Sequence, residues 1–220
     1  PYAYYLEQVD HIDDLPGYAQ GSFFMQDIGS MQVVELAGIK PGDAVIDVCA
    51  APGGKAMHAL AKLHGKGSVQ ARDLTENKVS MIEENIERCA GAADTIEVLV
   101  WDARILDPQA VEKADVVIAD LPCSGLGVIG RKSDIKYRMT PEQVADIAAL
   151  QREILSVVWQ YVKPGGILMY STCTLTKAEN QDNRDWFLEN SPFTLLEEKE
   201  LLPSAETDGF YMIKCRRNKA

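Results

Sequence analysis

Apolar residues along the chain form two kinds of pattern that follow one another. Short segments rich in apolar and β-branched residues lie at 44–48, 68–72, 95–100, 115–119 and 167–171. Apolar positions three and four apart, the spacing of one helix face, follow at 54–63, from Thr75 to Cys89 and from Thr140 to Tyr161. This alternation of strand and helix predicts an α/β fold with a mostly parallel sheet covered by helices on both faces.

Capping residues and turns refine these boundaries. Thr140 precedes Pro141 and stands three residues before Gln143, which is the pattern of a capping box at a helix start. Thr176 and Glu179 repeat that spacing and predict a further helix toward Leu188. Two late segments, 193–196 and 209–215, predict a closing pair of strands.

The first 28 residues show no sustained period. They are aromatic and acidic and contain a Pro16-Gly17 break. We therefore expect residues 1–28 to be a lead-in that packs on a catalytic domain formed by residues 29–220. Because the chain begins with Pro1, we expect it to be a fragment of a longer protein.

Composition is that of a globular domain, with 46% hydrophobic and 25% charged residues in 220. The five cysteines are scattered and form no CxxC pair, which argues against a disulfide framework and against a zinc site. No apolar run approaches the roughly 18 residues of a membrane span. These features predict a cytoplasmic protein without a metal. The net charge of −11 argues against a polyanionic partner unless basic residues gather locally.

A glycine-containing loop, Asp47–Lys55, joins the first predicted strand to its helix. Small residues let a ligand approach the backbone, and the start of a helix offers unpaired N–H groups to an anion. The loop has neither the P-loop pattern nor the GxGxxG pattern. It predicts a cofactor site, and the alternative is a turn that needs glycine for its geometry only.

Acidic residues at the next two strand ends favour the cofactor interpretation. Asp73 stands about 20 residues beyond the glycine loop, where an acid of this fold type hydrogen-bonds a ribose. Asp102 follows the third strand, beside Trp101, and can accept from an adenine amino group. Each acid alone is more often a solvated cap, but three acids ordered at successive strand ends predict an adenosine-bearing ligand.

Two cysteines follow apolar strands directly. Cys123 ends the run that begins at Val116, and Cys173 ends the run that begins at Gly166. In a parallel sheet both thiols reach the carboxyl edge, where ligands bind. Two thiols there suggest covalent chemistry, whereas the alternative is a pair of small buried residues.

These segments resemble the signature motifs of a known family. The motifs are Cys49–Lys55 (CAAPGGK), Asp120–Gly125 (DLPCSG) and Ser171–Thr174 (STCT) with Glu179–Asn180. In this order they are similar to the RNA cytosine-5 methyltransferases that use S-adenosylmethionine, over residues 23–211. The 131–137 segment and the chain end most resemble the RsmB (Sun/Fmu) branch, which methylates small-subunit ribosomal RNA.

The resemblance implies a Rossmann-like class I fold with a seven-stranded, mostly parallel sheet and an antiparallel last strand. It implies that Cys173 is the nucleophile, that Cys123 assists product release, and that Asp120 contacts the cytosine while Lys55 sets the local charge. The implied S-adenosylmethionine ligands are Cys49, Ala50, Ala51, Pro52, Gly53, Gly54, Lys55, Asp73, Asp102 and Asp120. Two departures stand out: Leu121 replaces the usual Ala or Pro, and 70–72 is unusually polar.

RNA is the expected partner of a monomer without membrane contact, and the branch carries an additional amino-terminal RNA-binding domain. A local basic cluster would offset the acidic charge, and its residues are Arg131, Lys132, Lys136 and Arg138. Tyr137 could stack on a base. The alternatives are a transfer RNA enzyme of the same chemistry and a non-catalytic RNA-binding module on the same fold. A small-molecule methyltransferase would not need two thiols.

Overall fold

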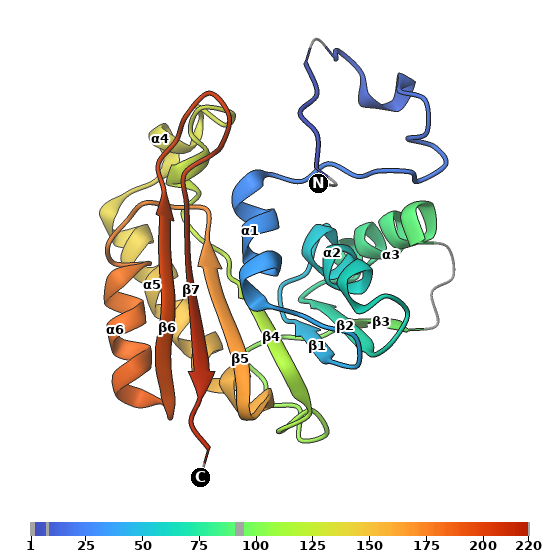
Figure 1. The fold of residues 1–220 in the computed structure, drawn as a ribbon. Coiled ribbons are helices and arrows are strands. Elements are labelled where there is room, and N and C mark those ends of the chain that lie inside the picture. The colour runs from blue at the N-terminus through green and yellow to red at the C-terminus, as the bar shows by residue number, and fades with distance from the viewer. Residues whose placement is uncertain (1–2, 8, 91–94, 220) are drawn as a thin grey trace.

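The computed structural model describes residues 3–7, 9–90 and 95–219, and its centre is one seven-stranded sheet (Figure 1). The strands are β1 (Ala44–Asp47), β2 (Ser68–Asp73), β3 (Ile96–Val100), β4 (Ala114–Asp120), β5 (Val162–Thr172), β6 (Phe193–Leu201) and β7 (Phe210–Arg217). Their order is β3-β2-β1-β4-β5-β7-β6, and β7 alone of these runs against its neighbours. The predicted fold, including the antiparallel last strand, is confirmed.

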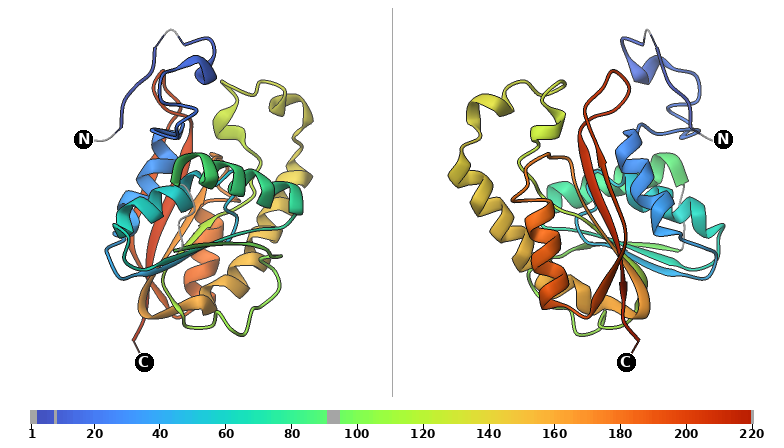
Figure 2. Two further views of the ribbon diagram at one scale, coloured as in Figure 1. Left: turned by 90° about the vertical axis from the view of Figure 1, so that its right-hand side faces the viewer. Right: turned by 60° about the vertical axis from the view of Figure 1, so that its left-hand side comes forward.

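Helices cover both faces of the sheet (Figure 2). One layer contains α1 (Ile28–Ala37), α2 (Gly54–Leu63) and α3 (Glu76–Ala90). The opposite layer contains α5 (Pro141–Val158) and α6 (Gln181–Asn190). A short helix, α4 (Ile135–Arg138), and three 3₁₀ turns, at Ile12–Asp14, Leu126–Val128 and Trp159–Tyr161, complete the described elements.

Alternate strand residues supply two separate cores. On β1, Val45 points toward α1, α2 and α3, while Ile46 packs in the core beneath α5 and α6. Because successive side chains of a strand point to opposite faces, a strand between two helix layers must be apolar on both. This explains the unbroken apolar run of β4, in which Val117 and Ile118 are fully buried.

Two helix boundaries depart from the sequence prediction. Helix α1 was not anticipated; Asp27 begins it by accepting a hydrogen bond from Gly29 N–H, and Gly38 ends it at a φ of 73°. The pattern at Thr176 and Glu179 is not a capping box, because α6 begins at Gln181 and Glu179 is fully buried. The capping box at Thr140 is present as predicted.

The predicted alternation of strand and helix breaks once. Residues 101–113, between β3 and β4, form turns and no helix. The connection between two parallel strands of one sheet usually contains a helix that covers the sheet. The face of β1, β2 and β3 that lies opposite α2 and α3 is therefore open.

The lead-in lies at the end of the sheet toward which the parallel strands point (Figure 1). Arg88 of α3 donates hydrogen bonds to the carbonyl oxygens of Tyr18 and Phe23, and its guanidinium stacks on the Tyr18 ring at 4.1 Å. Residues 1, 2 and 8 of the expected lead-in lie outside the described residues. Across the described helices, none is both long and apolar enough to cross a bilayer.

Candidate active site

The ends of β4 and β5 bring the two strand-end cysteines together. The strands are parallel neighbours in which Asp120 stands opposite Ser171, so the segments that follow them leave the sheet side by side. The Sγ atoms of Cys123 and Cys173 lie 3.2 Å apart. Their convergence, expected from the sequence, is present in the structure.

An ion pair lies beside the thiols. Lys55, in the first turn of α2, places its Nζ 2.5 Å from Oδ2 of Asp120 at the end of β4. The other Asp120 oxygen accepts a hydrogen bond from the Ser171 hydroxyl at 2.7 Å. Burial opposes the Lys55 charge, but Asp120 outweighs it, and the pKa of Lys55 is raised. The ammonium is thus held charged next to the cysteines.

The two thiols differ in acidity. The hydrogen bond from Cys123 lowers the pKa of Cys173, and the nearby Lys55 charge acts in the same direction against burial and Asp120. The same hydrogen bond, together with burial, raises the pKa of Cys123. Because a thiolate is the reactive form of cysteine, Cys173 is the better nucleophile of the pair and Cys123 is the weaker acid.

A small cavity of about 160 Å³ opens next to the Lys55–Asp120 ion pair, between the glycine loop and the start of α1. Its lining includes Met25, Gln26, Asp27, Ser30, Asp47, Cys49, Ala50, Ala51, Pro52, Gly54, Lys55 and Asp120. Gly53 has a φ of 106°, at which an L side chain is strained, and it stands directly before the first turn of α2. The structure thus brings most of the predicted cofactor residues to one cavity.

Asp73 has a structural contact in addition to its expected ligand role. Its Oδ2 accepts from the Ala51 backbone N–H at 3.0 Å, and Lys78 lies 2.9 Å from Oδ1. The carboxylate therefore ties the end of β2 to the glycine loop. Asp102 lies farther along the same edge, where it pairs with Arg104 at 2.6 Å, and that pairing lowers its pKa.

Asp47, the first residue of the predicted cofactor loop, was not among the residues implied to hold the cofactor. Asp47 ends β1, it is 1% exposed, and both of its carboxylate oxygens lack a hydrogen-bond partner among the described residues. Burial raises its pKa to about 7, although the nearby Lys55 charge acts against this. The strand-end rule that singled out Asp73 and Asp102 applies equally to Asp47 and would have added it to them.

The predicted basic cluster lies on and before α4, at the same end of the sheet as the lead-in (Figure 2). Its residues are Arg131, Lys132, Lys136 and Arg138. Arg131 forms ion pairs with Asp27 and Asp208, at 3.4 and 3.2 Å. Arg138 pairs with Asp134 within α4. Acidic partners thus neutralise part of the cluster, while Tyr137 is 81% exposed.

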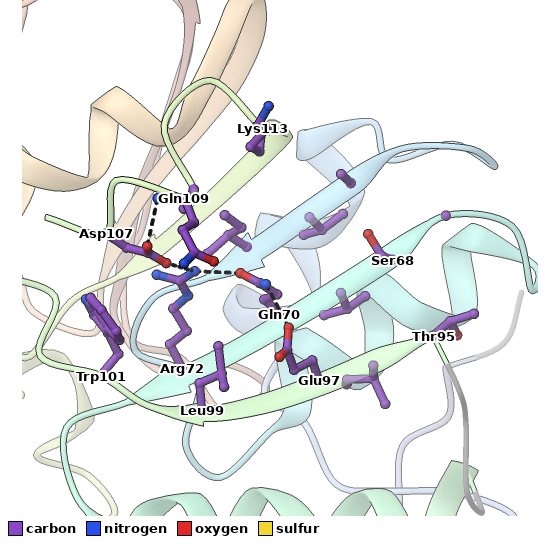
Figure 3. Close-up of a pocket in the computed structure, with 17 residues that line it drawn as sticks. Ser68, Gln70, Arg72, Thr95, Glu97, Leu99, Trp101, Asp107, Gln109 and Lys113 are labelled. Carbon is purple, nitrogen blue, oxygen red and sulfur yellow. Dashed lines mark hydrogen bonds and ion pairs between the residues drawn. The ribbon is translucent and has the colours of Figure 1, made fainter.

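A larger cavity, of about 710 Å³, lies on the open face of β1, β2 and β3 (Figure 3). There the Arg72 guanidinium donates to Gln70 at 2.6 Å and to Asp107 at 2.8 Å, and Gln70 continues the network to Glu97. Nε and Nη1 of Arg72 have no hydrogen-bond partner among the described residues. The absence of a covering helix leaves room on this face for the polar side chains of 70–72. This cavity contains neither cysteine.

The chain matches the family model described as 16S rRNA methyltransferase RsmB/F over residues 34–215. A ribosomal RNA small subunit methyltransferase B from Vibrio cholerae is 37% identical over 217 residues, which are 94% of this chain and 49% of that protein. The corresponding protein of Cronobacter sakazakii is 36% identical over 224 residues, which are 97% of this chain and 51% of that protein. The chain therefore spans about half the length of these relatives.

Solved structures give the same picture. NSun6 from Pyrococcus horikoshii, solved with SFG, superposes with a TM-score of 0.87 at 29% identity and covers 96% of this chain and 57% of that one. An S-adenosylmethionine-dependent O-methyltransferase from Thermotoga maritima, at 16% identity and a TM-score of 0.62, covers 90% of this chain and 67% of that one and shares the fold alone. The family match and the first of these neighbours confirm the expected cofactor, S-adenosylmethionine.

Proposed function

The chain belongs to the 16S rRNA methyltransferase RsmB/F family, and on this premise we propose that it methylates carbon 5 of a cytosine in small-subunit ribosomal RNA. One observation carries the proposal: two thiols 3.2 Å apart stand beside a buried Lys55–Asp120 pair and a glycine-loop cavity. A methyl transfer to oxygen or nitrogen would need neither thiol. A transfer to a ring carbon needs the base to be activated first.

Cys173 supplies that activation. Its thiolate adds to carbon 6 of the cytosine, and the new S–C bond breaks the ring conjugation and makes carbon 5 nucleophilic. S-adenosylmethionine, when bound, supplies an electrophilic methyl group on a sulfonium. The hydrogen bond from Cys123 has the largest effect on the pKa of Cys173 and lowers it. The charge of Lys55 acts in the same direction and so also favours the thiolate.

Release of the product requires a second group. After methylation, carbon 5 must lose its proton before the Cys173–carbon 6 bond can break. We assign this step to Cys123, directly or through water, because its Sγ lies 3.2 Å from that of Cys173. We assign the hydrogen bond to the cytosine edge to Asp120, which is paired with Lys55. A flipped base is required because this chemistry cannot occur inside a stacked helix.

The residues around the glycine loop fit the methyl donor. The uncompensated carboxylate of Asp47 suits the cationic donor, and residues 49–55 would hold its amino-acid portion through the backbone at the start of α2. Asp73 and Asp102 would hold the ribose and the adenine. Asp120, paired with Lys55, would separate the donor side from the cytosine side.

RNA affinity has to come from local positive charge, since the chain carries a net charge of −11. We assign RNA contact to Lys132 and Lys136 on and before α4, together with the partly paired Arg131 and Arg138. We include an additional RNA-binding domain in the proposal, because the relatives are about twice as long as this chain.

The test compares ribosomal RNA from cells with and without the gene by bisulfite sequencing, with transfer RNA sequenced in parallel. The expected result is one or more cytosines of the small-subunit RNA that lose protection when the gene is absent. Loss of protection in transfer RNA alone would move the substrate to that class. Unchanged protection in both RNAs would indicate a non-catalytic module.

A further inference from the structure

Glu179 is a buried acid that the chemistry above does not use. Its side chain is fully buried, and donors converge on both of its carboxylate oxygens. Oε1 accepts from the Ser124 backbone N–H at 2.8 Å and from Gln151 Nε2 at 3.2 Å. Oε2 accepts from the hydroxyl groups of Ser124 and Thr176, each at 2.6 Å. Burial of a carboxylate is costly without such donors, so this arrangement is specific rather than incidental.

The partners of Glu179 are the residues next to the thiols. Ser124 directly follows Cys123, and Thr174 directly follows Cys173. The hydroxyl oxygens of these two residues lie 2.7 Å apart. Because the Ser124 hydroxyl donates its proton to Glu179, it accepts from Thr174. A short chain of hydrogen bonds therefore runs parallel to the pair of sulfur atoms, one residue farther along each loop.

The backbone of each loop is held from the same place. Gln151, which donates to Glu179, also donates to the carbonyl of Pro122 at 2.8 Å. Asn180 donates to the carbonyl of Thr174 at 3.0 Å and accepts from the Thr172 hydroxyl at 2.6 Å. The residues on both sides of each cysteine are thus fixed from residues 179–180 and from α5.

We propose that Glu179 is a positioning residue that clamps the Cys123 and Cys173 loops together and so sets the separation of the two thiols. The effect of this clamp on catalysis rests on the proposed function. The clamp itself is a property of the folded protein and can be measured without RNA. It gives Glu179 a role that the apparent capping-box pattern in the sequence conceals.

A carboxylate suits this position better than an amide. The N–H groups of Ser124 and Gln151 can only donate to Oε1, whereas the hydroxyls of Ser124 and Thr176 at Oε2 can rotate and accept. Glu179→Gln can therefore place its oxygen at the first site and its amide nitrogen at the second. We expect Glu179→Gln to retain most of the clamp and Glu179→Ala to lose it.

Phenylarsine oxide tests the clamp directly. Its arsenic atom forms two As–S bonds with a pair of neighbouring thiols and releases one water molecule, so tight binding reports two sulfurs at short range. Binding to the Cys123–Cys173 pair is measured by mass spectrometry, with Cys49, Cys89 and Cys215 replaced by Ser or Ala. We expect the affinity to fall about 10-fold or more in Glu179→Ala and less than about threefold in Glu179→Gln, because a loop no longer fixed loses preorganisation.

The catalytic consequence is measured as single-turnover methyl transfer to ribosomal RNA. We expect a loss of about 100-fold in Glu179→Ala, since a misplacement of about 1 Å costs a factor of this size. Asn183→Ala is the matched control, because its buried side chain touches neither cysteine loop. It reaches Gln151 only at the amide oxygen, which keeps the Tyr170 hydroxyl as a donor, whereas the amide nitrogen of Gln151 serves the clamp. This control variant should lower thermal stability and leave arsenical binding unchanged.

Unchanged arsenical binding in Glu179→Ala overturns the clamp, and so does an equal loss in Asn183→Ala. If Glu179→Ala does not fold, Ser124→Ala removes the hydroxyl bridge and should weaken arsenical binding several-fold, and an unchanged affinity there also overturns the clamp. A wild-type protein that binds the arsenical tightly but methylates no RNA would refute the proposed function and leave the clamp standing.

Discussion

The two sides of the active site differ in how their buried polar groups are satisfied. On the thiol side, the buried side chains of Glu179, Ser124, Thr174 and Asn180 all bond to one another or to nearby backbone. On the glycine-loop side, both carboxylate oxygens of Asp47 are buried without a hydrogen-bond partner among the described residues. The chain thus fixes the geometry of the nucleophile by itself. The glycine-loop side, where the methyl donor would bind and which we call the donor side, retains an uncompensated carboxylate.

This difference has an energetic meaning. An unsatisfied buried polar group costs about 1–3 kcal/mol, and more if it is charged. Such a cost is tolerated at a site that a ligand completes, and it is avoided where geometry has to persist without the ligand. The comparison can be tested by removing groups on either side.

The largest effect should come from the nucleophile. We expect Cys173→Ala to reduce methyl transfer to background and to abolish covalent protein–RNA adducts, because Cys173 supplies the sulfur that adds to carbon 6 of the base. Transfer of radioactive methyl from S-adenosylmethionine to RNA measures the first effect, and denaturing gels measure the second. Residual adducts in this variant would assign the attack to Cys123.

Cys123→Ala should leave the attack intact and block release. We expect methylated RNA to remain attached to Cys173, so that a protein–RNA complex survives denaturing electrophoresis while multiple turnover stops. Mass spectrometry of the isolated complex identifies the attached residue. Normal turnover without an adduct would show that another group removes the carbon 5 proton.

Lys55→Gln should alter the pH dependence of methyl transfer. The pKa of Cys173 is lowered first by Cys123 and then by Lys55, so removal of the Lys55 charge raises it. The single-turnover rate rises with pH as the thiolate forms, and its rising limb should therefore move to higher pH in the variant. At pH 7 we expect a loss of about 10- to 100-fold.

Lys62→Gln is the matched control for this experiment. Lys62 is on the same helix and forms its ion pair with Glu35, away from the thiols. Its pH profile should coincide with that of the wild type. A profile of Lys55→Gln that also coincides would exclude electrostatic control by Lys55.

Asp47→Asn tests the donor side through stability. The pKa of Asp47 is raised by burial from 3.8 to about 7, so in this window the folded protein keeps a proton that the unfolded chain has lost. The stability that this group contributes is present below about pH 4 and is lost as the pH rises toward 7. Without donor, Asp47→Asn should match the wild type at pH 4 and exceed it at pH 8 by a few kcal/mol.

Urea unfolding at a series of pH values measures this difference. Asp115→Asn serves as the control, because Lys163 and the Ala44 N–H lower the pKa of Asp115 against its burial. The control should show the opposite sign and lose stability relative to the wild type above pH 4. Equal stability of Asp47→Asn and wild type at pH 8 would show that the carboxylate is already compensated.

Arg72→Met should have the smallest consequence for chemistry. Arg72 lies on the open face, where its ion pair with Asp107 at 2.8 Å has no contact with either cysteine. We expect the free energy of unfolding to fall by about 3 kcal/mol, because the largely buried Asp107 loses its partner, with methyl transfer unchanged. A loss of methyl transfer at saturating S-adenosylmethionine would show that the open face bearing Arg72 affects catalysis.

The hydrophobic pattern predicted the parallel sheet, the two helix layers and the edge at which the site lies, because strand and helix periods depend on local sequence. It missed α1, whose residues 28–37 are too evenly apolar to show a clear stripe. It also placed Glu179 in a helix cap, because the spacing to Thr176 is identical whether the acid turns toward the backbone or into the interior. Asp47 was left out of the implied cofactor residues although its position obeys the rule that found Asp73.

The sequence by itself determined which residues end the strands, and with them the candidates for nucleophile and cofactor contacts. Only the tertiary structure decided that Cys123 and Cys173 face each other at 3.2 Å and that the face bearing Arg72 is open. It also decided that the Asp47 carboxylate has no hydrogen-bond partner among the described residues. Periodicity fixes the direction of a side chain relative to its own strand or helix. Distances between loops depend instead on strand register and on hydrogen bonds between residues more than fifty positions apart, such as Ser124 and Glu179.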